Sequence, residues 1–354
     1  MNVIITIQHP AHVHFYRHAI DELEADGHEV HVFAREKDLA VPLLRAYDID
    51  HEVLVGSHDS IFDLALVQLT FEAKLLRRAR ALDPDVMTAI GGVAVSHVAP
   101  LVGARSVVFI DNEGAASHRI TTPVADVVCT PRRFNDDYGD KHVRYDGYQE
   151  LAYLHPDRFD PDPDRLRSYG IDPENRLFLL RFGRFGALHD VGEKGLSSDA
   201  RRRLVSLLDE YGDVYVTSET ELPPALQPYE LPVPPTLVHE LLAAADLYAG
   251  DSGTMATEAA VLGTPAVRCQ SFTAFSNFHE LEEYDLLRST DDDEEAIELV
   301  RELAVDETVP TQWQNRRQRL LNEKIDVTGF ITALLRKVGE ELPVESEVRT
   351  PTVR

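Results

Sequence analysis

Short runs of β-branched and aliphatic residues alternate along the chain with longer segments in which apolar positions recur every three or four residues. The runs predict strands, and the longer segments predict amphipathic helices. Strands that alternate with helices indicate βαβ units and a parallel sheet. In the first half of the chain the expected strands are Val3–Ile7, His28–Ala34, His51–Val55, Val86–Ala89, Ser106–Ile110 and Val127–Cys129.

The alternation stops at residues 155–164, where three prolines and four aspartates disfavour any regular element, and then resumes. We therefore expect an α/β protein with two Rossmann-like, doubly wound domains, residues 1–155 and 165–325, facing a central cleft where the carboxyl ends of both sheets bind ligand. The expected elements of the second domain are strands at Leu177–Arg181, Val214–Thr217, Leu247–Ala249 and Ala266–Arg268, and helices at Asp199–Tyr211, Leu237–Ala244, Thr254–Leu262 and Glu294–Ala304.

The ends of the chain and one apolar stretch complete the predicted organisation. A C-terminal helix is expected at 326–339, and residues 340–354, which lack periodicity, are expected to be a disordered tail. The charge-free stretch Val86–Ala104 contains glycines and a proline, so we interpret it as a buried strand, turn and helix rather than a membrane span. The N-terminus shows no signal-peptide pattern. We expect a cytoplasmic protein with no transmembrane segment.

Charge narrows the possible partners. The 354 residues include 35 basic and 61 acidic side chains, a net charge of −26 with neutral histidines. A broad basic surface for nucleic acid is therefore excluded, although phosphate can still bind locally. Such an acidic chain is typical of proteins adapted to high salt, as in halophilic archaea. The two cysteines, Cys129 and Cys269, are far apart in sequence and indicate no disulfide framework.

The most informative segment begins where the expected strand Leu247–Ala249 ends. It reads Gly250-Asp251-Ser252-Gly253 and leads into the expected helix Thr254–Leu262. The N-terminal amides of such a helix bind phosphate, and small residues let the backbone approach it closely. Glu258, four residues after Thr254, is the candidate for a ribose diol. The alternative is an ordinary turn with a helix cap. The candidate nucleotide-sugar-binding residues here are Asp251, Ser252, Gly253, Thr254 and Glu258.

Histidines cluster where the first strand ends. His9, His12 and His14 follow Val3–Ile7, and a neutral imidazole there can act as a general base or bind a sugar. The alternative is that any of them caps or packs a helix. His14 and His18 are spaced for one helix face, which suggests a metal, but no nearby cysteine or acid completes a ligand set. We therefore expect no metal site.

Two further segments follow strands at the expected ligand edge. Asp111 and Glu113 follow Ser106–Ile110 and are suited either to sugar hydroxyls or to capping the next helix. The glycine-bearing loop after Leu177–Arg181 is locally basic in a very acidic chain, which suits a diphosphate. Its arginines can instead pair with surface carboxylates. The basic residues for a diphosphate here are Arg181, Arg184 and Lys194, and the candidate nucleotide-sugar-binding residues of the loop are Arg184, His189 and Lys194.

These motifs resemble those of the GT-B superfamily, in particular the non-hydrolysing UDP-GlcNAc 2-epimerases and the transferases that form lipid II. The epimerases carry Asp-Ser-Gly-Gly-x-x-x-Glu-Ala followed by Leu-Gly-x-Pro; Ser252, Gly253 and Glu258 match, while Thr254 replaces the second glycine. The resemblance implies that serine and glycine bind the diphosphate and that glutamate binds the ribose. It also implies catalytic roles for His12, at the place of a Gly-Gly-His turn, and for Glu113, in a match to Val-Glu-Ala-Gly.

Residues 8–17 and 189–195 resemble an uncharacterised prokaryotic family, number 354 among domains of unknown function, over roughly residues 1–340. The epimerases' Gly-Asp-Thr is replaced by Gly91-Gly92-Val93, and their second glutamate has no counterpart near Ser117-His118-Arg119. Because epimerisation needs several acid and base groups, these losses favour glycosyl transfer. We expect a metal-independent, cofactor-free transferase that takes a UDP-sugar donor and an acceptor in surface polysaccharide or glycoconjugate synthesis. The alternatives are a UDP-sugar epimerase or hydrolase, or a non-catalytic nucleotide-sugar-binding subunit.

Overall fold

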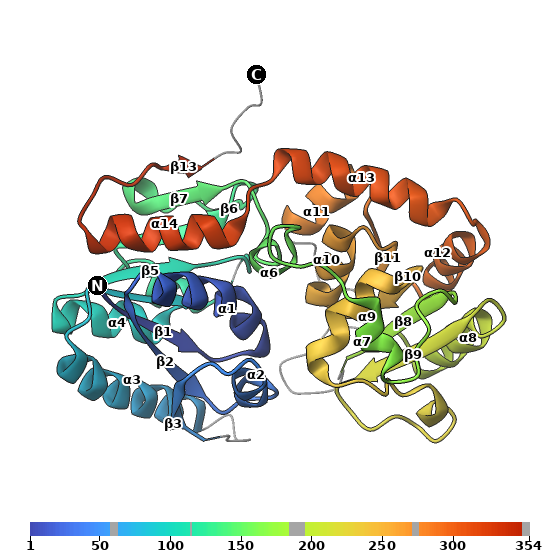
Figure 1. Ribbon diagram of the computed structural model, residues 1–354, viewed down its shortest axis with the longest axis horizontal. Coiled ribbons are helices and arrows are strands. Elements are labelled where there is room, and N and C mark those ends of the chain that lie inside the picture. The colour runs from blue at the N-terminus through green and yellow to red at the C-terminus, as the bar shows by residue number, and fades with distance from the viewer. Residues whose placement is uncertain (57–62, 114, 184–194, 271–275, 349–354) are drawn as a thin grey trace. The chain divides into compact units, whose positions relative to one another are not determined.

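The computed structural model describes residues 1–56, 63–113, 115–183, 195–270 and 276–348 (Figure 1). The chain divides into two compact units. The first consists of Met1–Arg158 together with Lys324–Arg354, and the second consists of Phe159–Glu323. In each unit parallel strands alternate with helices, as the hydrophobic pattern predicts.

In the first unit, the described residues form one sheet of eight strands in the order β13-β7-β6-β5-β4-β1-β2-β3, and every pairing is parallel. Central strands such as β1 are buried on both faces, which explains their continuous apolar sequences. The strands are β1 (Asn2–Ile7), β2 (Glu29–Arg35), β3 (His51–Val55), β4 (Val86–Ile90), β5 (Arg105–Phe109), β6 (Val127–Pro131), β7 (His142–Tyr145) and β13 (Glu347–Val348).

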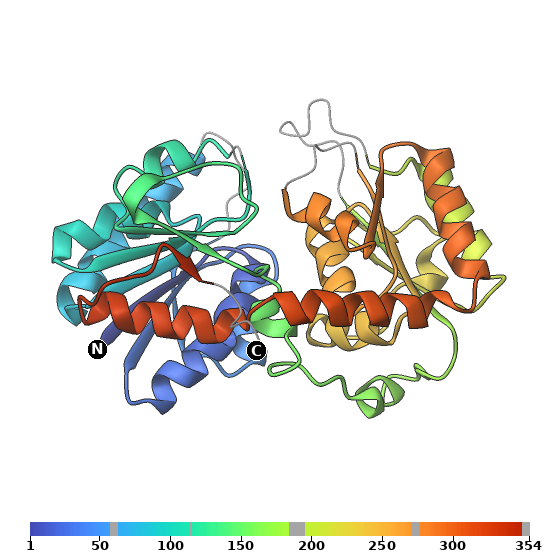
Figure 2. The same ribbon diagram turned by 90° about the horizontal axis from the view of Figure 1, so that it is seen from above.

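Helices cover both faces of this sheet. The helices are α1 (Pro10–Ala25), α2 (Ala40–Ala46), α3 (Asp63–Leu82), α4 (Val93–Val102), α5 (His118–Thr121), α6 (Leu151–Leu154) and α14 (Val327–Gly339). On one face, Phe71 of α3 and Val95 of α4 pack against strand residues such as Ile4. On the other face, α1 and α14 lie side by side although they come from opposite ends of the chain (Figures 1 and 2). The stretch Val86–Ala104 is β4, a turn and α4, as expected.

The C-terminal segment differs from the sequence-based expectation. The helix expected at 326–339 is present as α14, and it belongs to the first unit, an assignment that the sequence pattern did not provide. Arg158 bridges Glu22 of α1 and Asp326, the N-cap of α14. The described part of the expected disordered tail contains a strand, because β13 pairs with β7, which would otherwise leave backbone groups unpaired at the edge of the sheet, and Glu347 pairs with Arg132. Residues 349–354 lie outside the described part of the chain.

In the second unit, the described residues form a parallel sheet in the order β12-β11-β10-β8-β9. Helices α8 and α12 cover one face, where Phe178, Leu180 and Phe182 of β8 point into the core. The strands are β8 (Leu177–Phe182), β9 (Asp213–Ser218), β10 (Leu247–Gly250), β11 (Ala266–Cys269) and β12 (Leu287–Thr290), and the helices are α7 (Pro163–Arg167), α8 (Ser198–Leu208), α9 (Val238–Ala244), α10 (Gly253–Leu262), α11 (Ser276–Glu283), α12 (Asp293–Val305) and α13 (Val309–Glu323).

The expected fold class is confirmed, since the chain contains two doubly wound parallel α/β sheets. The elements that the pattern did not predict include β7, β12, β13, α7, α11 and α13, and α7 begins at Pro163, inside the segment where no regular element was expected. None of the helices in the described residues is long and apolar enough to cross a membrane. Cys129 and Cys269 are buried free thiols.

Candidate functional site

Each sheet has one position where the strand order reverses, and ligands of doubly wound folds bind beyond the carboxyl ends of the strands at that position. In the first unit the reversal lies between β1 and β4, and in the second between β8 and β10. The histidine cluster follows β1, and the Asp251–Glu258 motif follows β10. Both predicted motifs therefore lie at the reversal point of their own sheet.

The turn from β10 into α10 has the predicted form. Ser252 is the N-cap of α10, and its Oγ accepts a hydrogen bond from the backbone N–H of Met255 at 3.3 Å. The N–H groups of Gly253 and Thr254 belong to the first turn, whose amides have no acceptor within a helix, and the Thr254 side chain is exposed. This end of α10 combines a positive helix dipole with outward-facing amides, which is the arrangement that binds phosphate.

Both glycines of the turn have a packing reason. A Cβ on Gly250 would lie 2.5 Å from the carbonyl oxygen of Arg181, and one on Gly253 would lie 2.8 Å from Cζ of Phe278. The β8 backbone and the α11 ring thus require glycine at these positions.

Phe278 also stacks under the guanidinium of Arg268, which is 4.4 Å from the ring centroid and buried. Burial lowers the pKa of Arg268.

Glu258 is buried, and its Oε1 accepts a hydrogen bond from Nε2 of His239 at 3.0 Å. A spacing of four residues predicts that Thr254 and Glu258 share one helix face, but α9 covers α10 at the level of Glu258, so Thr254 is exposed and Glu258 is buried. The carboxylate therefore belongs to a buried polar pair. A carboxylate has about four acceptor positions, and the bond from His239 uses one of them.

Asp251 is buried between two strand ends. Its carboxylate accepts a hydrogen bond from the backbone N–H of Gly183, just after β8, and another from Nη2 of Arg201 on α8 at 3.2 Å. Desolvation raises the pKa of Asp251 to about 6, while Gly183 and Arg201 act in the opposite direction. Asp251 thus joins the carboxyl ends of β8 and β10, and its contacts are with the protein backbone and an arginine.

Of the residues proposed in the basic loop after β8, Arg181 is in the described part of the chain. Arg184, His189 and Lys194 lie outside the described residues. Arg181, the basic residue at the end of β8, donates to Oγ1 of Thr217 at 3.0 Å and pairs with Glu219 at 2.9 Å. That arginine therefore follows the alternative in which the basic residues pair with carboxylates.

The histidines after β1 have different environments. His9 is the exposed N-cap of α1, and its Nδ1 accepts from the backbone N–H of Ala11 at 3.3 Å. His14 is buried, with its ring centroid 5.3 Å from that of Tyr153 and 5.7 Å from that of Tyr47. His9 therefore caps a helix and His14 packs one, which are the two structural alternatives for this cluster.

His12 is half-buried at the first turn of α1. The backbone N–H of Gln8 donates to its Nδ1 at 3.4 Å, so in the neutral ring the proton is on Nε2. Burial lowers the pKa of His12 to about 3, with further contributions from the nearby charges of His9 and Lys37. A neutral imidazole with its proton on Nε2 donates a hydrogen bond to a ligand oxygen more readily than it removes a proton.

Asp111 and Glu113 follow β5 at the same edge of the first sheet. Desolvation raises the pKa of Asp111 to about 6, which is the range in which a carboxylate is an effective base near neutral pH. Oε1 of Glu113 accepts from the backbone N–H of Asn135, in the connection after β6, at 2.8 Å. Glu113 thus holds the connection that follows β6.

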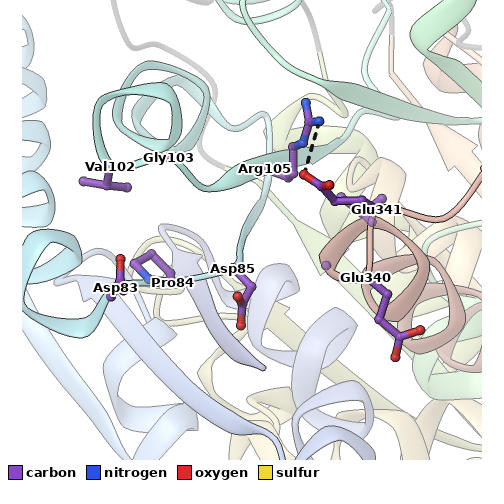
Figure 3. Close-up of a pocket in the computed structure, with 10 residues that line it drawn as sticks. Asp83, Pro84, Asp85, Val102, Gly103, Arg105, Glu340 and Glu341 are labelled. Carbon is purple, nitrogen blue, oxygen red and sulfur yellow. Dashed lines mark ion pairs between the residues drawn. The ribbon is translucent and has the colours of Figure 1, made fainter.

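A pocket of about 430 Å³ in the first unit lies at the opposite, amino edge of the sheet (Figure 3). Arg105 in this pocket pairs with Glu341 at 3.7 Å and with Asp126 at 3.0 Å, and Asp85 accepts from the N–H of Asn2 at 2.7 Å. No predicted site residue lines it. The lining residues are Asp83, Pro84, Asp85, Val102, Gly103, Arg105, Val338, Gly339, Glu340 and Glu341.

Side chains that commonly bind metals do not cluster in the described part of the chain. Within the residues that the structure describes, no three or more His, Cys, Asp or Glu side chains are grouped to hold a metal ion. The acidic run at 291–295 instead begins a helix. Oδ1 of Asp292 accepts from the N–H groups of Glu294 and Glu295, both at 2.9 Å, as the N-cap of α12.

The fold is shared with a UDP-GlcNAc 2-epimerase and with a rhamnosyltransferase of known structure. A UDP-GlcNAc 2-epimerase from Neisseria meningitidis, solved with UDP-GlcNAc, is similar with a TM-score of 0.65 at 12% identity, over 96% of this chain and 100% of that one. A spinosyn rhamnosyltransferase complexed with thymidine diphosphate is similar with a TM-score of 0.61 at 15% identity, over 94% and 99% of the two chains. The chain therefore has the GT-B fold that the motifs imply.

The sequence also places the chain in a family. It matches the family described as "Protein of unknown function (DUF354)" over residues 1–328, and it belongs to that family. An uncharacterized protein of Methanocaldococcus jannaschii is 22% identical over 313 residues, which are 85% of this chain and 91% of that protein. The family resemblance that the sequence motifs indicated is thereby confirmed.

Three residues near the second motif were not identified from sequence. These residues are His239, Arg201 and Phe278. His239 is 19 positions from Glu258 on a different helix, and Arg201 and Phe278 lie on two further helices. No local spacing connects any of them to the Asp251–Glu258 motif. The sequence signal that could have identified His239 is its place as a polar residue on the inner face of the expected helix Leu237–Ala244.

Proposed function

We propose that this protein transfers the glycosyl group of a nucleoside diphosphate sugar, with a UDP-sugar as the favoured donor, to an acceptor hydroxyl in surface polysaccharide or glycoconjugate synthesis. In this reaction the acceptor oxygen bonds to the anomeric carbon as the bond from that carbon to the diphosphate oxygen breaks. The acceptor proton passes to a base, and the nucleoside diphosphate leaves as an anion.

The observation that carries the proposal is the N-terminus of α10 at the reversal point between β8 and β10, with Glu258 one turn further along the helix. The amides of Gly253 and Thr254 and the dipole of α10 would bind the diphosphate, and Glu258 would accept hydrogen bonds from the ribose. The proposal includes no metal, because a helix N-terminus stabilises a leaving diphosphate without one. The neighbours solved with UDP-GlcNAc and thymidine diphosphate support this choice of donor class.

The acceptor side of the proposal rests on the carboxyl edge of the first sheet. Asp111, with its pKa raised to about 6, is the proposed base for the acceptor hydroxyl. His12, whose Nδ1 accepts from Gln8, would donate a hydrogen bond from Nε2 to a sugar or acceptor oxygen. Glu113 would support this edge through its bond to Asn135.

We expect Glu258→Gln to weaken UDP binding by about 10- to 100-fold, because hydrogen bonds to a charged group contribute ~1.5–3 kcal/mol. Ser252→Ala is the matched comparison from the same turn, and it should have a smaller effect because its Oγ is already engaged as a helix cap. Titration calorimetry with UDP on both variants and on the wild type measures these affinities. A dissociation constant unchanged by Glu258→Gln would contradict the ribose assignment.

The reaction type needs a turnover assay. Nucleotide sugars that raise the melting temperature in high salt would be incubated with and without acceptor sugars, in EDTA and with Mg²⁺. Release of UDP that depends on an acceptor and persists in EDTA is the expected result. A changed sugar without acceptor would indicate an epimerase, UDP release without acceptor a hydrolase, and binding without turnover a non-catalytic subunit.

A further inference from the structure

We infer that His239 is a positioning residue for the nucleotide: its Nε2–H holds the carboxylate of Glu258 in the orientation that recognises the ribose 2′-hydroxyl. This inference rests on the proposed function, since it assumes that Glu258 contacts a ribose. It adds a residue from outside the sequence motif, and it assigns the discrimination between ribose and deoxyribose to one buried pair.

The geometry of the pair sets the direction of the hydrogen bond. The two side chains are 3% and 6% exposed, and Nε2 of His239 lies 3.0 Å from Oε1 of Glu258. A carboxylate can only accept, so His239 carries the shared proton on Nε2. A hydrogen bond to an ionised group away from water is stronger than a neutral one. The hydrogen bond from His239 therefore holds the Glu258 side chain, which has three rotatable bonds, in one orientation.

The helix that carries His239 is itself held in place. Glu240, the next residue on α9, is buried and forms an ion pair with Arg165 of α7. Beyond the end of α10, Oγ1 of Thr264 donates to the carbonyl oxygen of Leu242 at 2.6 Å, which joins α9 to the turn that follows α10. The ring of Phe159 meets His239 edge-on, with centroids 6.3 Å apart. The imidazole is thus oriented by its surroundings.

This arrangement has a consequence for specificity that simple packing does not have. A site built to hydrogen-bond a hydroxyl rejects the analogue that lacks it, because a buried polar group then loses its partner. The rejection depends on the carboxylate being held toward that hydroxyl. Removing the donor at position 239 should therefore lower the preference for UDP over 2′-deoxy-UDP, whereas a general loss of structure weakens both nucleotides equally.

The test compares the ratio of the two dissociation constants, for UDP and for 2′-deoxy-UDP, by titration calorimetry. We expect the wild type to prefer UDP by about tenfold or more. His239→Phe should reduce the preference to about twofold or less, and His239→Gln, whose amide can still donate, should retain most of it. His239→Asn, which is too short to reach Glu258, is the second variant if the phenylalanine is not tolerated. His279→Phe, at an exposed histidine 3.5 Å from Glu282, is the matched control.

The outcomes separate this inference from the proposed function. A wild type that prefers UDP, together with a His239→Phe variant of unchanged ratio, would overturn the positioning role alone, even if both affinities fell. A wild type that binds the two nucleotides equally would overturn the ribose contact of Glu258, and the inference with it. Loss of the ratio in His239→Phe and in His239→Asn, with normal melting temperatures, is the result that supports it.

Discussion

At the scale of single residues, burial shifts the pKa values of His12 and Asp111 in opposite directions. The low pKa of His12, about 3, leaves its ring neutral at physiological pH, and Nδ1 is occupied by Gln8. The pKa of Asp111, about 6, makes its carboxylate a stronger base than an exposed aspartate. Asp111 is therefore suited to act as the base, and His12 is suited to donate a hydrogen bond.

We predict that Asp111→Asn lowers kcat by about 10²–10⁴ and leaves UDP affinity near that of the wild type, which is the usual effect of removing a positioned base. His12→Ala should mainly raise the KM for the acceptor. Because the base must be ionised, kcat of the wild type should fall as pH drops below about 6. Steady-state kinetics from pH 5 to pH 8 measure both effects.

The exposed acid Asp136, replaced by Asn, is the control for a general charge effect on the kinetics. If Asp111→Asn kept both the rate and the acidic fall in kcat, Asp111 would not be the base. If His12→Ala lost the rate instead, while Asp111→Asn did not, the histidine would have the larger chemical role despite its low pKa.

At the scale of elements, the ends of β8 and β10 are held together by the carboxyl of Asp251. Its pKa is raised to about 6 by burial, so the folded protein binds this proton more tightly than the unfolded chain does. The stability that this protonation contributes is fully present below the ordinary aspartate pKa of about 4 and is lost as the pH rises through 6. Above pH 6 the folded protein contains a buried charge, which Arg201 only partly compensates.

We predict that Asp251→Asn becomes more stable relative to the wild type as the pH rises from 4 to 7, by up to ~3 kcal/mol, because the amide cannot ionise. Urea unfolding of both proteins across this range gives the difference in unfolding free energy, and half of the change is expected by about pH 5, midway between the unfolded and the folded pKa of the carboxyl. Asp291→Asn removes an exposed carboxylate from the same unit and is the control. A difference that is constant with pH would show that Asp251 does not titrate in this range.

The elements that the hydrophobic pattern predicted are those that bury a continuous apolar face. Strands such as β1 and β8 and helices such as α10 have this property and were predicted. By contrast, β12 reads Leu-Arg-Ser-Thr, and α13 is largely polar, with Trp313 among its few buried residues. The turn that begins α10 was predictable from its own residues. The pair of His239 with Glu258 was not, because tertiary packing alone brings α9 and α10 together.

At the scale of the whole molecule, the net charge of −26 is the dominant electrostatic feature. Surface ion pairs such as Arg203 with Glu294 contribute little individually, and salt weakens them. The repulsion among the excess acidic side chains acts over longer distances, and salt shortens its range from about 10 Å at 0.1 M to about 3 Å at 1 M. Screening should therefore remove more repulsion than attraction.

We predict that the melting temperature rises by several degrees between 0.1 and 1 M KCl and levels off at higher concentrations, once the screening length is shorter than the spacing of surface charges. A change of 1 kcal/mol shifts the melting temperature of domains of this size by about 2–4 °C, so the effect is measurable by calorimetry. Sucrose at equal osmolality is the control, because it acts by exclusion from the surface and does not screen charge. A melting temperature that falls with KCl would mean that local ion pairs outweigh the long-range repulsion, and adaptation to high salt would then not explain the acidic composition.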